Sequence, residues 1–79
     1  MPLNGYLTDD QASLLDWVAS RHPMPCNGFG WTSSSGKPYA YRTVMGVLKR
    51  KGWVDKVEGT SYPVYYQLNK EAVEVMGVG

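Results

Sequence analysis

The chain has 79 residues, of which 43% are hydrophobic and 19% charged, and its formal net charge is +1 at pH 7. This length predicts one domain over residues 1–79, and the composition is typical of a globular protein and not of a disordered one. No apolar run approaches the roughly 20 residues of a membrane span, and the first ten residues lack the regions of a secretion signal. The single cysteine, Cys26, cannot form an internal disulfide. We therefore expect a cytoplasmic protein with no membrane partner, either a monomer or a weak homodimer.

The first predicted element is a helix from Asp9 to about Arg21. Thr8 and Gln11 have the spacing of a capping box, in which each side chain bonds the other residue's backbone N–H. The helix should end before Pro23, which restricts the residue in front of it. Its apolar residues recur at helical spacing and should pack on a second helix; they are Leu14, Leu15 and Val18.

A long loop is predicted next, from His22 to Lys37, with the sequence HPMPCNGFGWTSSSGK. Two prolines, three glycines and three consecutive serines disfavour a helix. We expect no helix longer than about two turns between His22 and Gly36, and we expect Phe29 and Trp31 to fill part of the core. So long a loop in a small domain is unusual and is often functional.

The second predicted helix runs from Pro38 to Lys51. Proline suits a first helical turn, and the basic run KRK complements the helix dipole in the last turn. Gly52 follows at the position where a left-handed C′ residue is expected. The side of the helix predicted to face the core carries Tyr41, Val44, Met45 and Leu48.

A hairpin and a short helix complete the predicted elements. Residues 53–57 and 64–68 are rich in β-branched and aromatic side chains, and the run EGTSYP between them has turn chemistry, with Gly59 able to adopt a positive φ. Asn69 is a good N-cap for a short terminal helix that Gly77 ends. The order of elements predicts the α+β class.

At these residues the chain resembles the second half of a winged helix-turn-helix domain, and it is similar to MarR- and PadR-type bacterial regulators. The resemblance lies in the order helix, LKRKGWV, hairpin, VYYQLNKEA, and it covers residues 39–72. It implies a small winged-helix domain with a helix, a long loop, a recognition-type helix, a two-stranded wing and a short C-terminal helix. The chain departs from the family at residues 22–37, where the family has a further helix.

Positive charge is concentrated on the second predicted helix and its exit. Residues 37–56 hold six of the eight Lys and Arg residues but only one of the seven Asp and Glu residues. A DNA-binding element has this distribution, although a solvated helix end has it too. On a duplex, such a helix would offer side chains to base edges and phosphates. The predicted DNA-binding residues are Lys37, Tyr39, Arg42, Thr43, Gly46, Lys49, Arg50 and Lys56.

Two functions follow from these patterns. The first is binding of double-stranded DNA, as a small transcriptional regulator or a phage-encoded DNA-binding factor. The second is a protein–protein interaction adaptor with a winged-helix fold, because fold does not dictate function. The missing second helix, a near-neutral total charge and a hairpin tip without Lys or Arg favour the adaptor. Exposed Tyr and Trp are also enriched at protein interfaces.

Catalysis, metals and cofactors have little support in the sequence. Cys26 and His22 lie near each other in the chain, but a cysteine nucleophile also needs an orienting third group. One cysteine and one histidine cannot make a structural zinc site. The chain contains neither GxxxxGK[ST] nor GxGxxG. We therefore expect a protein that is not an enzyme and that holds no metal and no cofactor.

Overall fold

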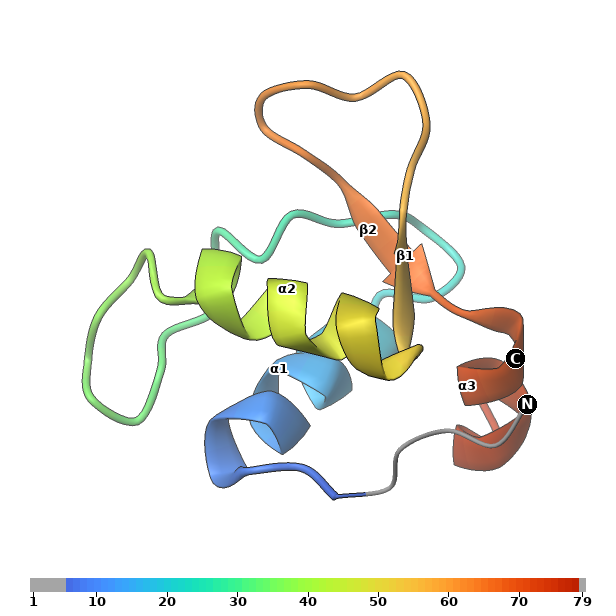
Figure 1. The fold of residues 1–79 in the computed structure, drawn as a ribbon, viewed down its shortest axis with the longest axis horizontal. Helices are drawn as coiled ribbons and strands as arrows, with labels where there is room; N and C mark the ends of the chain where they lie inside the picture. The colour runs from blue at the N-terminus through green and yellow to red at the C-terminus, as the bar shows by residue number, and fades with distance from the viewer. Residues whose placement is uncertain (1–5, 79) are drawn as a thin grey trace.

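The computed structural model describes residues 6–78 and has three helices and a two-stranded antiparallel sheet, which confirms the α+β class (Figure 1). In the view of Figure 1, α1 lies behind α2, and the connection between the two strands projects away from the helices. None of the helices in this described part of the chain has the length and apolar character needed to cross a membrane. The elements in chain order are α1 (Asp9–Ala19), α2 (Tyr41–Lys51), β1 (Val54–Lys56), β2 (Tyr66–Leu68) and α3 (Lys70–Met76).

The capping box at the start of α1 is confirmed. The Thr8 hydroxyl accepts the Gln11 N–H at 3.3 Å, and the Thr8 N–H donates to Oε1 of Gln11 at 3.0 Å. The helix ends at Ala19, earlier than the expected Arg21. Arg21 and His22 each donate a backbone hydrogen bond to the carbonyl three residues earlier, so they form tight turns in place of a further α-helical turn.

The core lies where α1 packs on α2 and where β1 contacts α2 and β2 contacts α1. Leu48 is fully buried, as predicted, and Val44 is only partly buried at the edge of the core. Protein interiors are close-packed, so changes in the volume of fully buried side chains are costly. The buried hydrophobic residues are Leu14, Leu15, Val18, Trp31, Tyr41, Met45, Leu48, Trp53, Val54, Leu68 and Ala72.

The start of α2 differs from the expectation. The helix begins at Tyr41 and not at Pro38, and residues 38–40 form a turn before it. The N-cap is Ala40, which has no side-chain oxygen to hold the first N–H groups. The end of the helix is as predicted, because Gly52 adopts φ 86° and its N–H donates to carbonyls of the last helical turn.

The loop between α1 and α2 contains no helix within residues 22–36, as predicted. Trp31 is buried, and its indole N–H donates to the Ser13 hydroxyl at 2.9 Å. The prediction for Phe29 is wrong: this side chain is 46% exposed, and its ring packs in a T-shaped arrangement with that of Tyr41, with 5.4 Å between the ring centroids. The turn closed by the Trp31 N–H and the Gly28 carbonyl directs Trp31 inward and leaves Phe29 outside.

Both strands are shorter than expected, because the ladder ends where the hairpin opens into a loop. Within this loop, the Thr60 hydroxyl donates to the Val57 carbonyl at 2.7 Å and accepts the Tyr65 N–H at 3.3 Å. We call residues 57–65 the hairpin loop. The antiparallel register pairs Val54 with Leu68, Asp55 with Gln67 and Lys56 with Tyr66.

The other edge of β2 holds the long loop in place. Cys26 and Tyr66 form an antiparallel bridge, with N–H to carbonyl distances of 2.9 and 2.8 Å. Further along the loop, the Ser34 N–H donates to a carboxylate oxygen of Asp10 on α1 at 2.8 Å. The loop is therefore fixed to the sheet at one end and to a helix at the other.

The terminal helix α3 begins as the sequence predicts. The Asn69 side-chain oxygen accepts the Glu71 N–H at 2.8 Å, and Gly77 ends the helix with φ 68°. Ala72 is buried against the core, which anchors this short helix to the domain.

Candidate functional site

The exposed side of α2 carries most of the predicted DNA-binding residues. At about 100° per residue, the five predicted residues within α2 lie on one side of the helix, and the buried residues of α2 lie on another. Seven of the eight predicted residues are exposed, and Gly46 is partly buried with open space where a Cβ would lie. The residues that α2 brings together are Arg42, Thr43, Gly46, Lys49 and Arg50.

The other three predicted residues lie outside α2. Lys37 precedes the turn before the helix, and its N–H donates to the Ser33 hydroxyl at 3.3 Å. Tyr39 lies in that turn with its side chain 67% exposed. Lys56 is the last residue of β1, at the base of the hairpin loop. Lys37 and Tyr39 thus add exposed basic and polar side chains before α2, and Lys56 adds one after it.

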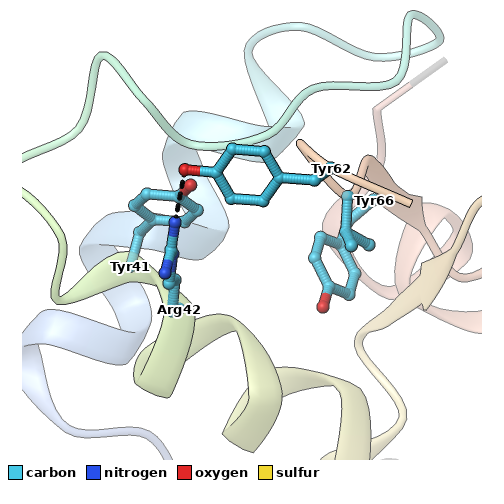
Figure 2. Close-up of a pocket in the computed structure, with 5 residues that line it drawn as sticks. Tyr41, Arg42, Tyr62 and Tyr66 are labelled. Atoms are coloured by element: carbon cyan, nitrogen blue, oxygen red, sulfur yellow. Dashed lines mark hydrogen bonds between the residues drawn. The ribbon is translucent and has the colours of Figure 1, made fainter. Parts of the chain in front are cut away.

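A contact that the sequence did not reveal joins α2 to the hairpin loop. The Arg42 guanidinium donates through Nη2 to the Tyr62 hydroxyl at 2.7 Å (Figure 2). Its central carbon lies 5.2 Å from the Tyr62 ring centroid and 6.0 Å from that of Tyr39. The guanidinium therefore lies among aromatic rings, where the ring quadrupoles attract it.

The same surroundings favour the charged form of the Arg42 side chain. Hydrogen bonding with the Tyr41 hydroxyl, followed by attraction to Tyr62, raises the pKa of Arg42 above its usual value. An arginine side chain is effectively always protonated in proteins. The site thus keeps one fixed positive charge beside the hairpin loop, which itself carries Glu58 and no Lys or Arg.

A pocket lies between α2 and the hairpin. Its volume is about 290 Å³, and it is lined by Tyr41, Arg42, Tyr62, Val64 and Tyr66. Tyr41 is buried and Tyr66 partly buried, whereas Tyr62 is 71% exposed. In Figure 2, Tyr62 reaches across toward Arg42, and Tyr66 lies on the opposite side from Tyr41. Sequence reasoning missed this pocket because its walls come from segments distant in the chain.

Cys26 and His22 do not form part of this site. Burial raises the pKa of the Cys26 thiol, and the nearby Arg21 charge and a hydrogen bond from the Gly28 backbone lower it by less. In residues 6–78, no three His, Cys, Asp or Glu side chains are grouped so that they could hold a metal ion. Within the described residues, the candidate functional site is therefore the surface formed by α2 and the hairpin.

Comparisons of the chain with protein-family models, with curated proteins and with solved structures give no match. Its function is therefore inferred from the geometry of α2, the hairpin loop and the pocket between them.

Proposed function

We propose that the protein is a winged-helix DNA-binding protein in which α2 enters the major groove of duplex DNA. The observation that carries this proposal is the position of the cations on the exposed side of α2, opposite the core. Arg42 lies near the start of the helix, and Lys49 and Arg50 lie near its end. Cations placed along one helix side can neutralise successive phosphates while the helix reads base edges. We propose that it acts in the cytoplasm as a small transcriptional regulator or a phage-encoded DNA-binding factor.

The arrangement around α2 supports a winged helix. The hairpin follows α2 directly, α1 packs on the side of α2 turned away from the cations, and Cys26 adds a third extended segment beside β2. The hairpin loop would then be the wing. Since it lacks a cation, it would contribute the Tyr62 side chain to the DNA and not a positive charge.

The residues of α2 would have different roles on the duplex. Arg42 has five N–H donors, and its hydrogen bonds with the Tyr62 and Tyr41 hydroxyls leave further donors that can reach a guanine edge. Lys49 and Arg50 would contact phosphates. The open space at Gly46 would let the DNA backbone approach the helix closely.

The proposal is tested by fluorescence anisotropy with random-sequence duplex DNA over a range of salt concentrations. Affinity should fall steeply with salt, because each phosphate contact releases condensed counterions. Arg50→Ala should weaken binding to all sequences and reduce the magnitude of the salt slope by about one. Lys70→Ala is the matched control: it removes an exposed cation from α3, outside the proposed interface, and should leave the slope unchanged. A folded protein that binds no duplex at low salt would overturn the proposal.

A second measurement separates base reading from phosphate binding. Once a preferred sequence has been selected from a random library, Arg42→Ala should relax the preference at one base position. The expected loss there is about 1–3 kcal/mol if the contact is bidentate. A uniform loss over all sequences would instead assign Arg42 to the backbone.

The exposed aromatic side chains favour a second candidate, a protein-binding adaptor. Tyr39 and Tyr62 are 67% and 71% exposed, and tyrosine is enriched at protein interfaces. An adaptor would bind no duplex beyond a weak non-specific level. Binding to a purified partner would instead be lost when Tyr39 or Tyr62 is replaced by alanine.

A further inference from the structure

We infer that the pocket between α2 and the hairpin loop holds an unpaired nucleobase, so that the protein prefers DNA with a single-stranded base beside the duplex. This inference rests on the proposed DNA binding and adds the kind of DNA end or junction that is recognised.

The walls of the pocket suit a planar aromatic ring. Three of the five lining side chains are tyrosines, one each from α2, the hairpin loop and β2. Aromatic side chains stack on any base, because every base has a π-face. The hydroxyl groups of the tyrosines can donate to or accept from the edge of the base. A site of this kind would accept the four bases with little preference among them.

The size of the pocket limits what enters it. Its volume of about 290 Å³ lies just below the range of roughly 300–1,000 Å³ for small-molecule sites. One base fits this space, whereas a base pair in a duplex is wider and remains stacked between its neighbours. The base must therefore be unpaired, or be taken out of the stack at a cost of a few kcal/mol.

Arg42 connects the pocket to the basic side of α2. It lines the pocket and also begins the helix side that carries Lys49 and Arg50. The phosphate attached to a base in the pocket would lie near the positive charge of this guanidinium, whose remaining N–H donors would still face the guanine edge of the adjoining duplex. The five lining residues include no carboxylate, so a phosphate there meets no like charge from the pocket. The strand could then continue along α2.

Tyr62 is positioned to close over the base. Its ring is 71% exposed, and its hydroxyl is held by Arg42 at 2.7 Å. One hydrogen bond thus orients an otherwise solvent-exposed ring beside the pocket before any ligand binds. Orientation in advance lowers the entropy lost on binding.

The test compares a blunt duplex with the same duplex carrying a short single-stranded overhang, of either polarity. The first unpaired position holds 2-aminopurine, whose emission falls when the base is stacked. The overhang should increase affinity by about fivefold to a hundredfold, which corresponds to stacking of one base on an aromatic side chain. Binding should also quench the 2-aminopurine emission.

Variants of the hairpin loop assign the effect to the pocket. Tyr62→Ala should bring the ratio of overhang to blunt affinity close to one and abolish the quenching. Tyr62→Phe keeps the ring but loses the hydrogen bond to Arg42 that orients it, and it should give a ratio and a quenching between those of the wild type and Tyr62→Ala. Tyr65→Ala is the matched control, since Tyr65 lies in the same loop but does not line the pocket. It should leave the ratio unchanged.

The results separate the inference from the proposed function. Equal affinity for blunt and overhang duplexes would overturn the inference and leave duplex binding intact. No binding to any DNA would overturn both. The last measurement uses the free 2-aminopurine nucleotide. The protein could quench its emission in a way that depends on Tyr62 while the overhang does not increase affinity. The pocket would then bind a soluble nucleotide, and the inference that it holds an unpaired base of a DNA strand would be wrong.

Discussion

Gly30 lies so close to the Trp17 ring that a Cβ on Gly30 would be 2.4 Å from Cη2 of that ring. Real Cβ atoms essentially never come this near another heavy atom, so any larger residue here would force the Trp17 ring or the loop to shift. The Arg21 guanidinium lies over the same ring, with its central carbon 3.1 Å from the ring centroid. Trp17 is therefore enclosed by a loop glycine and by a cation from the end of α1.

This contact predicts opposite effects of alanine at two glycines. Gly30→Ala should destabilise the protein by about 1–3 kcal/mol, because the added methyl group forces the ring or the loop to shift. Gly46→Ala should stabilise it by about 0.5–1 kcal/mol, since Gly46 lies inside α2 and has open space at its Cβ position. Urea denaturation measures both. Shifts of the same sign would contradict the packing at Trp17.

The second prediction concerns Leu48, whose side chain is fully buried where α1 meets α2. Leu48→Ala should cost about 2–5 kcal/mol through lost burial and the cavity left behind. That is a large part of the total stability of a typical domain, about 5–15 kcal/mol. Val75→Ala on the exposed side of α3 is the control and should change stability by less than about 0.5 kcal/mol. A Leu48→Ala melting temperature equal to that of the wild type would refute the assigned core.

The third prediction concerns the capping box of α1. Thr8→Ala should lower the free energy of unfolding by about 1 kcal/mol, because the Gln11 N–H loses its side-chain acceptor. Thr43→Ala makes the same chemical change at an exposed position inside α2 and should be neutral or slightly stabilising. Chemical denaturation followed by circular dichroism distinguishes the two. Equal losses would mean that the cap contributes nothing specific.

The fourth prediction concerns the pH dependence of Cys26. The thiolate is the reactive form of cysteine, and burial raises the pKa of this thiol. Iodoacetamide should therefore modify the folded protein more slowly than the urea-unfolded chain at mildly alkaline pH. The midpoint of the rate against pH should also lie higher for the folded protein.

The same pKa shift links the Cys26 thiol to stability. As pH rises past the pKa of the unfolded chain, the unfolded state loses the thiol proton while the folded state keeps it. Stability therefore falls in the window between the unfolded and the folded pKa. Cys26→Ser should remove this part of the decrease. An unchanged pH profile of stability in that variant would show that the thiol is not the group responsible.

Local signals in the sequence predicted the helices and their ends where a single residue determines the geometry. Thr8 with Gln11 starts α1, Gly52 ends α2, and Asn69 starts α3, each through contacts within a few residues. The helical period of the apolar residues also predicted which side of α2 is exposed. The start of α2 was misplaced because proline permits a helical first turn without requiring one.

The features that sequence did not predict depend on distant segments. Phe29 and Trp31 are both aromatic and lie two positions apart in the loop, and the turn closed by the Gly28 carbonyl and the Trp31 N–H decides which of them enters the core. The Arg42–Tyr62 contact joins residues 20 positions apart, and no periodicity relates them. The pocket is lined by residues of α2, of the hairpin loop and of β2, so it depends on how the tertiary structure places these segments.

The bridge between Cys26 and Tyr66 provides a way to measure how firmly the long loop is attached. The amide proton of each residue is held by the carbonyl of the other, so both protons are released together when the loop leaves β2. Native-state deuterium uptake at these two amides therefore reports the free energy of loop detachment. Uptake at the Leu48 amide, inside a core helix, reports the opening of the domain instead. A gap between the two free energies would show that the loop detaches while the rest of the domain stays closed.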